Sequence, residues 1–413
     1  MTESAGTAVD TDRFELGVNY WPRRKAMYFW SDFDRDEVKG EFRVISDLGL
    51  GWVRLFLLWD DFQPAPDVVS ERSVDALNAV CDVAVEAGLR LNVTFFTGHM
   101  SGPNWAPGWL LEGEPAPGAR ALVSGGKLVE RGYRNPFVDP AALDAEELLL
   151  ETVVGRLAGH PAVGVWNLGN EPDLFAEPPT SEAGRAWVKR MRQVIRRFDR
   201  TTPVTLGLHI DSLKRDNGFR VDQVFAETDL AVMHAYSMYT SWARDPLDAE
   251  VVAYACAVTQ ELAGRPVLME EVGGCTVPGD GPATVWNWEA YGKSRSQFMA
   301  SEQGFADHVD RLLNRLWEQG ATGVYLWCYA DYVPALWDRP PCSDARHERH
   351  FGLVRPDGTL KPHAKVVERF AAQTRRVRPP PTDFRLGLSA DEFYADPDAE
   401  LERNFTRYLA SLR

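Results

Sequence analysis

The sequence carries a glutamate at a point where an apolar run stops abruptly. Trp166-Asn-Leu-Gly-Asn-Glu-Pro-Asp173 presents Asn170 and Glu171, and then Pro172, whose nitrogen cannot donate a hydrogen bond to a continuing sheet. A strand that ends in this way places a carboxyl group at the rim of a sheet. A carboxyl group held there can act as a general acid, a general base or a nucleophile.

A second apolar run ends on two neighbouring glutamates. Arg265-Pro-Val-Leu-Met-Glu-Glu-Val-Gly-Gly274 contains Glu270 and Glu271, and its glycines let the chain turn away. Because side chains alternate along a strand, we expect only one of the two to face the interior and the other to be a buried, supporting acid. Two opposed carboxyl groups suit the cleavage of a glycosidic bond, and a separation of about 5–5.5 Å would indicate a retaining, double-displacement reaction.

Both segments belong to an alternation of apolar runs and amphipathic segments that predicts an α/β fold, the (β/α)8 TIM barrel. Carboxyl groups on its fourth and seventh strands would face one another across the barrel. The predicted strands are Phe14–Asn19, Gly51–Leu57, Arg90–Phe96, Ala162–Leu168, Val204–His209, Leu230–His234, Pro266–Glu270 and Gly323–Cys328. The predicted helices are Asp34–Leu48, Ser73–Ala87, Leu143–Leu157, Ala183–Phe198, a short one near Val221–Glu227, Ala249–Ala263, Phe305–Gln319 and His363–Ala372.

The chain has 413 residues, and a barrel of this kind needs about 250. We expect a flexible N-terminus (1–13), the catalytic barrel (14–376) and a C-terminal extension (377–413). The surplus within the barrel falls after the third, seventh and eighth strands, at 97–141, 272–300 and 329–361, which predicts long βα loops around a cleft on the C-terminal face. After a proline-rich spacer, 389–412 predicts one or two charged helices, which pack on the barrel or reach a neighbouring subunit to form a homo-oligomer.

Composition excludes several classes of partner. With 45 Lys and Arg against 60 Asp and Glu, the net charge of -15 argues against nucleic acid and anionic membranes as partners. The sequence contains no apolar run of about 18 residues and no basic, apolar leader at its start. The five cysteines are scattered without a Cys-x-x-Cys pair, which favours buried free thiols in a reducing compartment. The predicted location is the cytoplasm.

The two glutamate segments together resemble the paired signatures of retaining glycoside hydrolases of the (β/α)8 clan. Within that clan, residues 14–372 are most similar to glycoside hydrolase family 5, the family of cellulases, mannanases and exo-β-mannosidases. The resemblance implies that Glu171 is the acid/base and Glu271 the nucleophile, with Glu270 as a rival for the second role. One departure is Val272, which stands where the family usually has phenylalanine.

The same resemblance implies a set of residues that support the reaction and bind the sugar. Arg54, in Trp52-Val-Arg-Leu55, would keep the nucleophile ionised, although a structural ion pair is the alternative. Tyr236, in His234-Ala-Tyr236, would donate to the nucleophile. The predicted substrate-binding residues are Arg54, His99, Trp105, Asn170, His234, Tyr236 and Trp327, and His99 and His234 have a structural role as their alternative. No His-x-His pair occurs, so neither a metal nor a cofactor is expected.

Tryptophan is abundant, with 14 copies. Sugars stack their C–H faces on aromatic rings, so tryptophans gathered on the loop face predict a sugar-binding surface. Eight tryptophans fall at predicted strand ends or in βα loops: Trp21, Trp59, Trp105, Trp109, Trp286, Trp288, Trp327 and Trp337.

Together these features predict an exo-acting β-mannosidase that cleaves short β-mannosides. Long loops could wall off one end of the cleft, and the segments 95–105 and 350–358 resemble the mannosidase and mannanase members of family 5. An endo-β-1,4-mannanase or a β-glucosidase with the same mechanism remains an alternative. An inactive, carbohydrate-binding barrel is the alternative without catalysis.

Overall fold

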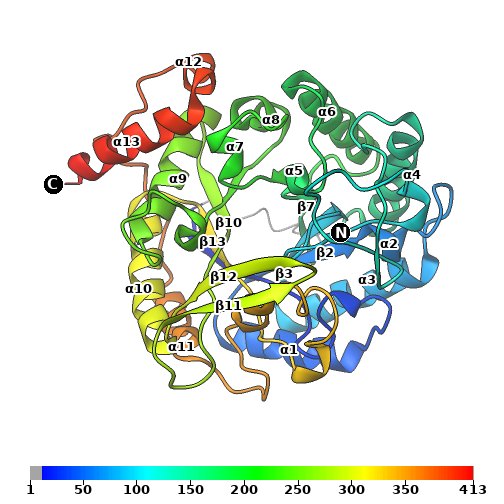
Figure 1. Cartoon of the computed structure of the whole chain (residues 1–413), viewed down its shortest axis with the longest axis horizontal. Helices are drawn as coiled ribbons and strands as arrows, with labels where there is room; N and C mark the ends of the chain where they lie inside the picture. Colours follow the sequence, from blue (N-terminus) through cyan, green and yellow to red (C-terminus); the bar gives the residue numbers. More distant parts are fainter. Residues whose placement is uncertain (1–11, 413) are drawn as a thin grey trace, which may run out of the picture.

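Eight parallel strands form one sheet in the order β8-β7-β3-β2-β1-β13-β10-β9, and helices surround it (Figure 1). This computed structural model describes residues 12–412. The predicted (β/α)8 barrel is thereby confirmed. The barrel strands are β1 (Glu15–Asn19), β2 (Trp52–Leu58), β3 (Arg90–Thr97), β7 (Val163–Asn170), β8 (Val204–Gly207), β9 (Ala231–His234), β10 (Val267–Gly273) and β13 (Gly323–Trp327).

The two end strands of this sheet, β8 and β9, close the barrel through a short seam. The backbone N–H of His234 donates to the Leu208 carbonyl at 2.8 Å, and the N–H of Ile210 donates to the His234 carbonyl at 3.0 Å. An isolated parallel bridge joins His209 to His234 at the same level. The seam therefore ends at the C-terminal mouth of the barrel.

Each predicted helix is present, and most begin at a side chain that caps the free N–H groups of the first turn. Asp34, Ser70, Asp139, Thr180 and Ser301 each accept a backbone hydrogen bond there. The helices are α1 (Arg35–Asp47), α3 (Glu71–Ala87), α4 (Pro140–Leu157), α6 (Ser181–Phe198), α8 (Val221–Glu227), α9 (Ala249–Ala263), α10 (Glu302–Glu318) and α11 (Pro362–Ala371). Among residues 12–412, none of the helices combines the length and the apolar character that crossing a membrane requires.

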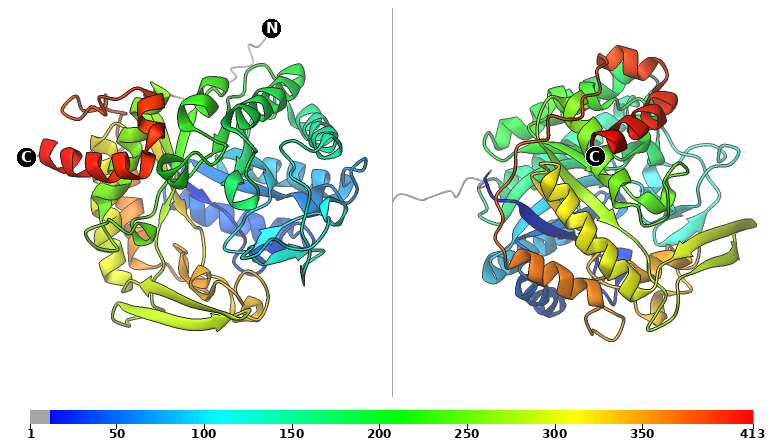
Figure 2. Two further views of the ribbon diagram at one scale, coloured as in Figure 1. Left: turned by 45° about the horizontal axis from the view of Figure 1, so that its top comes forward. Right: turned by 90° about the vertical axis from the view of Figure 1, so that its left-hand side faces the viewer.

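The long loops contain ordered structure that periodicity does not reveal. Residues 97–141 hold a small sheet of β4 (Asn104–Trp105), β5 (Leu122–Ser124) and β6 (Lys127–Val129). Residues 272–300 form a hairpin of β11 (Thr284–Ala290) and β12 (Lys293–Met299), which projects from the barrel in Figure 2. The loop after β13 contains the short helices η4 (Pro334–Leu336) and η5 (Arg346–His350).

The C-terminal extension, for which one or two helices were predicted, forms two, α12 (Ala390–Ala395) and α13 (Pro397–Ser411). It packs on the outside of its own barrel (Figure 2). There Tyr254 of α9 contacts the rings of Phe405 and Tyr408, each at a centroid distance of 5.3 Å. Assembly into a homo-oligomer through this extension stays a prediction. Of the predicted N-terminal segment 1–13, residues 1–11 lie outside the described residues.

The packing around Gly17 leaves no room for an added methyl group, which predicts that substitution by alanine destabilises the barrel. A Cβ on Gly17 of β1 would lie 2.4 Å from the Tyr325 ring and 2.9 Å from Trp52 Cβ, whereas a Cβ on Gly40 of α1 meets nothing within 4 Å. We expect Gly17→Ala to lower the free energy of unfolding by about 1–3 kcal/mol. The control Gly40→Ala should raise it by about 0.5–1 kcal/mol. Denaturant unfolding measures both, and equal stability of the two variants would contradict this packing.

Candidate active site

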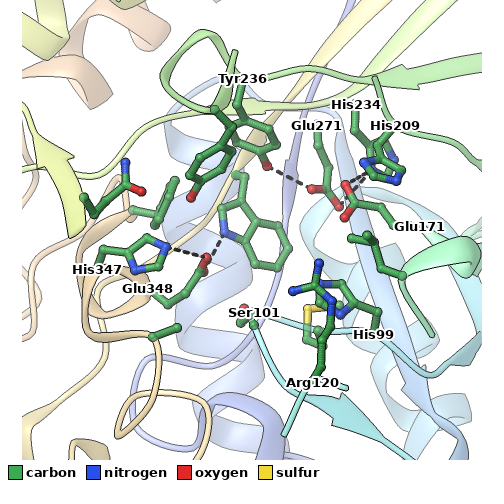
Figure 3. A pocket seen from close by; sticks show the side chains of 18 of the residues that line it. His99, Ser101, Arg120, Glu171, His209, His234, Tyr236, Glu271, His347 and Glu348 are labelled. Carbon is green, nitrogen blue, oxygen red and sulfur yellow. Dashed lines mark hydrogen bonds and ion pairs between the residues drawn. The ribbon is translucent and has the colours of Figure 1, made fainter. Parts of the chain in front are cut away.

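A cavity of about 490 Å³ opens at the C-terminal mouth of the barrel (Figure 3). Glu171 and Glu271 both line it, so the structure brings the two predicted carboxyl groups together. The loop 97–141, the hairpin β11–β12 and the loop that carries η5 also contribute to its wall. All three predicted long loops therefore surround one pocket.

Glu171 directly follows β7 and adopts an unusual backbone conformation. Its φ of 44° lies in the left-handed region, and Pro172 begins the short helix α5 (Pro172–Phe175) immediately afterwards. Such a conformation costs a non-glycine residue about 1–3 kcal/mol and tends to occur at functional sites. Its backbone N–H donates to the Gly207 carbonyl at 2.9 Å, which ties the strained turn to β8.

Glu270 and Glu271 both point into the barrel, so the prediction that only one would do so is wrong. The pairing of β10 with β9 runs through Met269 and Met233 and then resumes at Glu271 and His234, skipping Glu270. The same irregularity interrupts the pairing with β13. A β-bulge of this kind adds one residue to a strand and resets the alternation of its side chains. Two adjacent carboxyl groups can therefore reach the interior.

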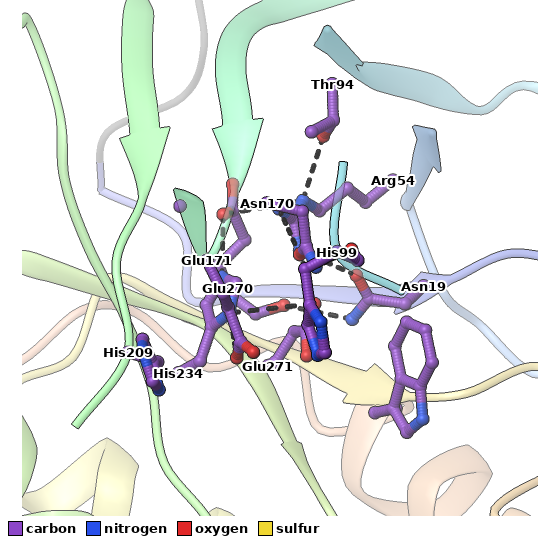
Figure 4. Close-up of polar contacts among 12 residues, drawn as sticks. Asn19, Arg54, Thr94, His99, Asn170, Glu171, His209, His234, Glu270 and Glu271 are labelled. Carbon is purple, nitrogen blue, oxygen red and sulfur yellow. Dashed lines mark hydrogen bonds and ion pairs between the residues drawn. The ribbon is translucent and has the colours of Figure 1, made fainter. Parts of the chain in front are cut away.

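Arg54 of β2 lies between these carboxyl groups and is fully buried (Figure 4). Its Nη1 donates to Glu271 Oε1 at 2.5 Å and to Asn19 Oδ1 at 3.2 Å. Its Nη2 donates to Asn170 Oδ1 at 3.0 Å, and its Nε donates to Thr94 Oγ1 at 3.0 Å. The guanidinium thus fixes Glu271 and Asn170 relative to each other, which connects the motifs on β7 and β10.

Glu270 is enclosed beneath the pocket and does not line it. Asn92 Nδ2 donates to its Oε1 at 2.6 Å, and Asn167 Nδ2 contacts both of its oxygens at 2.9 Å. Arg54 Nε and His234 Nε2 lie 3.4 and 3.1 Å from Oε2. With no exposed surface, Glu270 occupies the position of a supporting acid, while Glu271 faces the cavity.

His234 contacts all three glutamates. Its Nδ1 lies 3.0 Å from Glu171 and 3.6 Å from Glu271, and its Nε2 faces Glu270. Burial lowers the pKa of His234, but the negative charge of Glu271 and the hydrogen bonds to the other two glutamates outweigh burial and raise it. The protonated imidazolium can then donate to a carboxylate on each side.

The pKa values of Glu171 and Glu271 depend on each other and on these histidines. Burial raises the pKa of Glu271 despite the nearby charges of His234 and Arg54, and the charge of Glu171 raises it further. Burial also acts to raise the pKa of Glu171, but the charges of His209 and His234 outweigh it and lower this pKa. The two carboxyl groups titrate as a pair, and the histidines determine how strongly Glu171 holds a proton.

His209 lines the pocket and was missed by the sequence prediction. Its Nε2 contacts both carboxylate oxygens of the buried Asp173 at 3.0 Å. Burial lowers the pKa of His209, but the charges of Asp173 and Glu171 raise it to about 9. The available signal was its place at the end of the fifth predicted strand, where the mouth of a barrel begins.

Five of the predicted binding residues line the pocket, whereas Arg54 is fully buried beneath it and reaches it only through its contacts with Glu271 and Asn170. The Tyr236 hydroxyl donates to Glu271 Oε2 at 2.9 Å, and Asn170 Nδ2 donates to the His99 carbonyl at 3.1 Å. Burial lowers the pKa of His99 to about 4, so its ring is neutral near pH 7. The residues in this set are His99, Asn170, His234, Tyr236 and Trp327.

Trp105 is not brought to the pocket. Only 3 % of its surface is exposed, its Nε1 donates to the Met100 carbonyl, and its ring packs edge-on against Tyr28. This corrects its assignment as a substrate-binding residue, because a buried ring in a loop has no face to offer a sugar.

The predicted tryptophan surface is likewise much smaller than expected. Of the eight loop tryptophans, only Trp288 and Trp327 line the pocket. Trp21 stacks on Phe56, and Trp59 donates through Nε1 to Gln63 at 2.7 Å. Most of these rings therefore fill the space beneath the loops.

One group of side chains in residues 12–412 has the geometry to hold a metal ion. Ligand atoms of Glu171, His234 and Glu271 all lie within 4.8 Å of one another. Each of them is already engaged, because Glu271 accepts from Arg54 and Tyr236, and His234 contacts Glu171. The hydrogen bonds among the residues account for the cluster, and the expectation of a metal-free site stays a prediction.

Known structures share this fold over most of its length. GH5_18 from Streptomyces cattleya, solved in complex with GlcNAc, matches with a TM-score of 0.76 and 23 % identity, covering 97 % of this chain and 92 % of that one. A variant of GH5_18 from the same organism, solved with Manb1-4GlcNAc, matches with a TM-score of 0.75 and 23 % identity, covering 96 % and 92 %. The exo-beta-1,4-mannosidase Op5Man5 from Opitutaceae bacterium strain TAV5 matches with a TM-score of 0.70 and 23 % identity, covering 89 % and 62 %.

Sequence comparison identifies the family. No curated protein matches the chain. The family described as "Glycosyl hydrolases family 2, TIM barrel domain" matches residues 118–374, which is more than half of the sequence. The predicted glycoside hydrolase barrel is confirmed, and its family 5-like form is confirmed by the fold of the GH5_18 structures. The chain belongs to the glycosyl hydrolase family 2 TIM-barrel domain family and is a glycoside hydrolase.

Proposed function

We propose that the protein is a retaining exo-β-mannosidase that cleaves short β-mannosides. The observation that carries the retaining mechanism is the proximity of the two pocket carboxyl groups, because one oxygen of Glu171 lies within 4.8 Å of one oxygen of Glu271. Retaining glycosidases hold their carboxyl groups about 5–5.5 Å apart, whereas inverting enzymes leave room for a water at about 6.5–9.5 Å.

In this proposal Glu271 is the nucleophile and Glu171 the acid/base. The charges of His209 and His234 lower the pKa of Glu171 and burial raises that of Glu271, so this mechanism requires the one proton of the interacting pair to lie on Glu171 when the sugar is bound. The Glu271 carboxylate, oriented by Arg54 and Tyr236, then attacks the anomeric carbon while Glu171 gives that proton to the departing oxygen. A glycosyl ester of Glu271 forms and the aglycone leaves as an alcohol. Glu171, now a carboxylate, takes a proton from water, whose oxygen attacks the same carbon and restores ionised Glu271. Two inversions leave the configuration retained.

The choice of an exo-acting mannosidase has separate support. The hairpin β11–β12 and the η5 loop both contribute residues to the pocket wall, as an enzyme that removes terminal sugars requires. Among the structural neighbours are an exo-beta-1,4-mannosidase and a GH5_18 variant in complex with Manb1-4GlcNAc. The cytoplasmic location, the possible homo-oligomer and the absence of a cofactor remain part of the prediction.

A substrate panel tests this function. We expect hydrolysis of 4-nitrophenyl β-mannoside but not of the β-glucoside, and release of mannose alone from mannotetraose, measured by absorbance and by chromatography. Hydrolysis restricted to the glucoside would favour the β-glucosidase. Release of mannobiose from mannotetraose would favour the endo-mannanase, and binding without hydrolysis would favour the inactive barrel.

Azide rescue tests the two carboxylate roles. Glu171→Ala should lower kcat/KM for mannobiose by about 10²–10⁴-fold, lose less on an aryl mannoside, and yield a β-mannosyl azide when azide is added. Glu271→Ala should yield the α-azide instead, because azide then replaces the nucleophile. The exposed Glu402→Ala is the control and should behave as the wild type. Swapped azide configurations would reverse the roles, and labelling of Glu270 by a 2-fluoro mannoside would transfer the nucleophile to that residue.

The charge of His209 predicts a shift in the pH profile. Because the protonated His209 lowers the pKa of Glu171, His209→Gln should raise the two apparent pKa values of the carboxyl pair. Both limbs of the kcat/KM profile for an aryl β-mannoside should therefore move to higher pH. His160→Gln, on the surface beside Asp82, is the matched control and should leave both limbs in place. An unchanged profile for His209→Gln would show that its charge does not reach the pair.

A further inference from the structure

A third carboxyl group, that of Glu348, faces the same cavity from η5. It is 8 % exposed, and its Oε2 accepts from Trp327 Nε1 at 3.3 Å. Figure 3 shows Glu348, His347 and Ser101 at the side of the pocket away from Glu171 and Glu271. The pocket therefore has an acidic group at each end of the space that a sugar would fill.

Few charged or hydrogen-bonding neighbours offset the free-energy cost of burying the Glu348 carboxyl group. Among residues 12–412 its one ion-pair neighbour is His347, whose Nε2 lies 3.7 Å from Oε1. Burial lowers the pKa of His347 to about 4, so this ring is neutral near pH 7 and supplies no charge. His347 Nδ1 is itself buried without a hydrogen-bond partner. A carboxyl group buried without a cation is costly unless other donors complete its hydrogen bonds.

Contacts with the hairpin β11–β12 hold the loop that carries Glu348 in place. Trp288 of the hairpin donates through Nε1 to the Asp344 carbonyl at 2.7 Å, and its ring packs against His347 with centroids 5.6 Å apart. Arg295 of the same hairpin donates to Asp344 Oδ1 at 3.0 Å. These contacts fix the wall that contains Glu348, so the carboxyl group is presented on a rigid support.

We propose that Glu348 is a specificity-determining residue that accepts hydrogen bonds from two neighbouring hydroxyls of the terminal sugar, those furthest from the anomeric carbon. The proposal rests on the function proposed above, because that function places the anomeric carbon between Glu171 and Glu271. A sugar stacked on Trp327 would then bring its C4 hydroxyl and one neighbour toward Glu348. Because both hydroxyls must be free to donate to Glu348, the enzyme would accept only terminal sugars that carry no substituent on them.

The test is a cycle of enzyme and substrate changes. Wild type, Glu348→Ala and Glu348→Gln are each assayed with 4-nitrophenyl β-mannoside and with its 4-deoxy analogue. We expect Glu348→Ala to lower kcat/KM for the mannoside by about 10–100-fold but to change that for the 4-deoxy analogue only slightly, since the lost partner is already missing. Glu348→Gln keeps an acceptor oxygen and should therefore lower kcat/KM for the mannoside less than Glu348→Ala does.

Two further results separate this role from others. If Glu348 only holds Trp327 in place, Glu348→Ala lowers kcat/KM by the same factor for both substrates, and the proposal is overturned. Arg346→Ala, an exposed residue of the same helix η5, is the matched control and should leave both substrates unaffected. If the wild type cleaves a different aryl β-glycoside, the proposed mannosidase fails, and the same cycle with that glycoside and its 4-deoxy analogue still decides the role of Glu348. Circular dichroism verifies that each variant is folded.

Discussion

The buried guanidinium of Arg54 is the charge on which the interior of the barrel depends. Glu270 and Glu271 are buried and the side chain of Glu171 is only 13 % exposed, and isolated carboxylates in such surroundings would be strongly destabilised. Arg54 contacts Glu271 and Glu270 and also holds Asn170, which precedes Glu171. One cation from β2 thus compensates acids on β10 and aligns the end of β7. Replacement by lysine would not preserve this, since an ammonium group cannot supply the same planar set of donors.

The bulge in β10 determines how Glu270 and Glu271 are oriented. A regular strand would have turned either Glu270 or Glu271 away from the interior. The extra residue lets Glu270 anchor Arg54 and His234 from below while Glu271 remains accessible above. A reactive carboxyl group and its structural support therefore come from adjacent positions of one strand, which keeps their geometry independent of loop movements.

Much of this arrangement could be predicted from the sequence, and the reasons are local. Alternating apolar runs and capped amphipathic segments specify a barrel, and a proline directly after Asn170 and Glu171 marks the end of its strand. The bulge could not be predicted, because strand parity assumes a regular ladder. Trp105 and most other loop tryptophans were misassigned, since a sequence does not tell a ring beneath a loop from one that faces a cavity. The hairpin 284–299 was missed because its side chains are mostly exposed and its second strand, 293–299, has no apolar residue before Phe298.

Residues His209 and Glu348 were missed for a different reason. Each acquires its character from neighbours distant in sequence: Asp173 beside His209, and Trp327 beside Glu348. Spacing along the chain carries no trace of such contacts. Arg54 and Glu271, in contrast, lie on strands and Tyr236 follows one. The order of these strands in the barrel is fixed by the fold, so the meeting of the three residues could be anticipated.

The seam between β8 and β9 gives the barrel one wall that differs mechanically from the rest. His209 stands on one side of it and His234 on the other, and the positive charge of each, when protonated, lowers the pKa of Glu171. The other strand pairs of the barrel form ladders within the sheet, several of them with register shifts, whereas this pair lies at the two ends of the sheet. Because both histidines lie at this seam, its width sets the distances from two imidazole rings to the carboxyl group of Glu171. The affinity of Glu171 for a proton therefore depends on the geometry of the seam between β8 and β9.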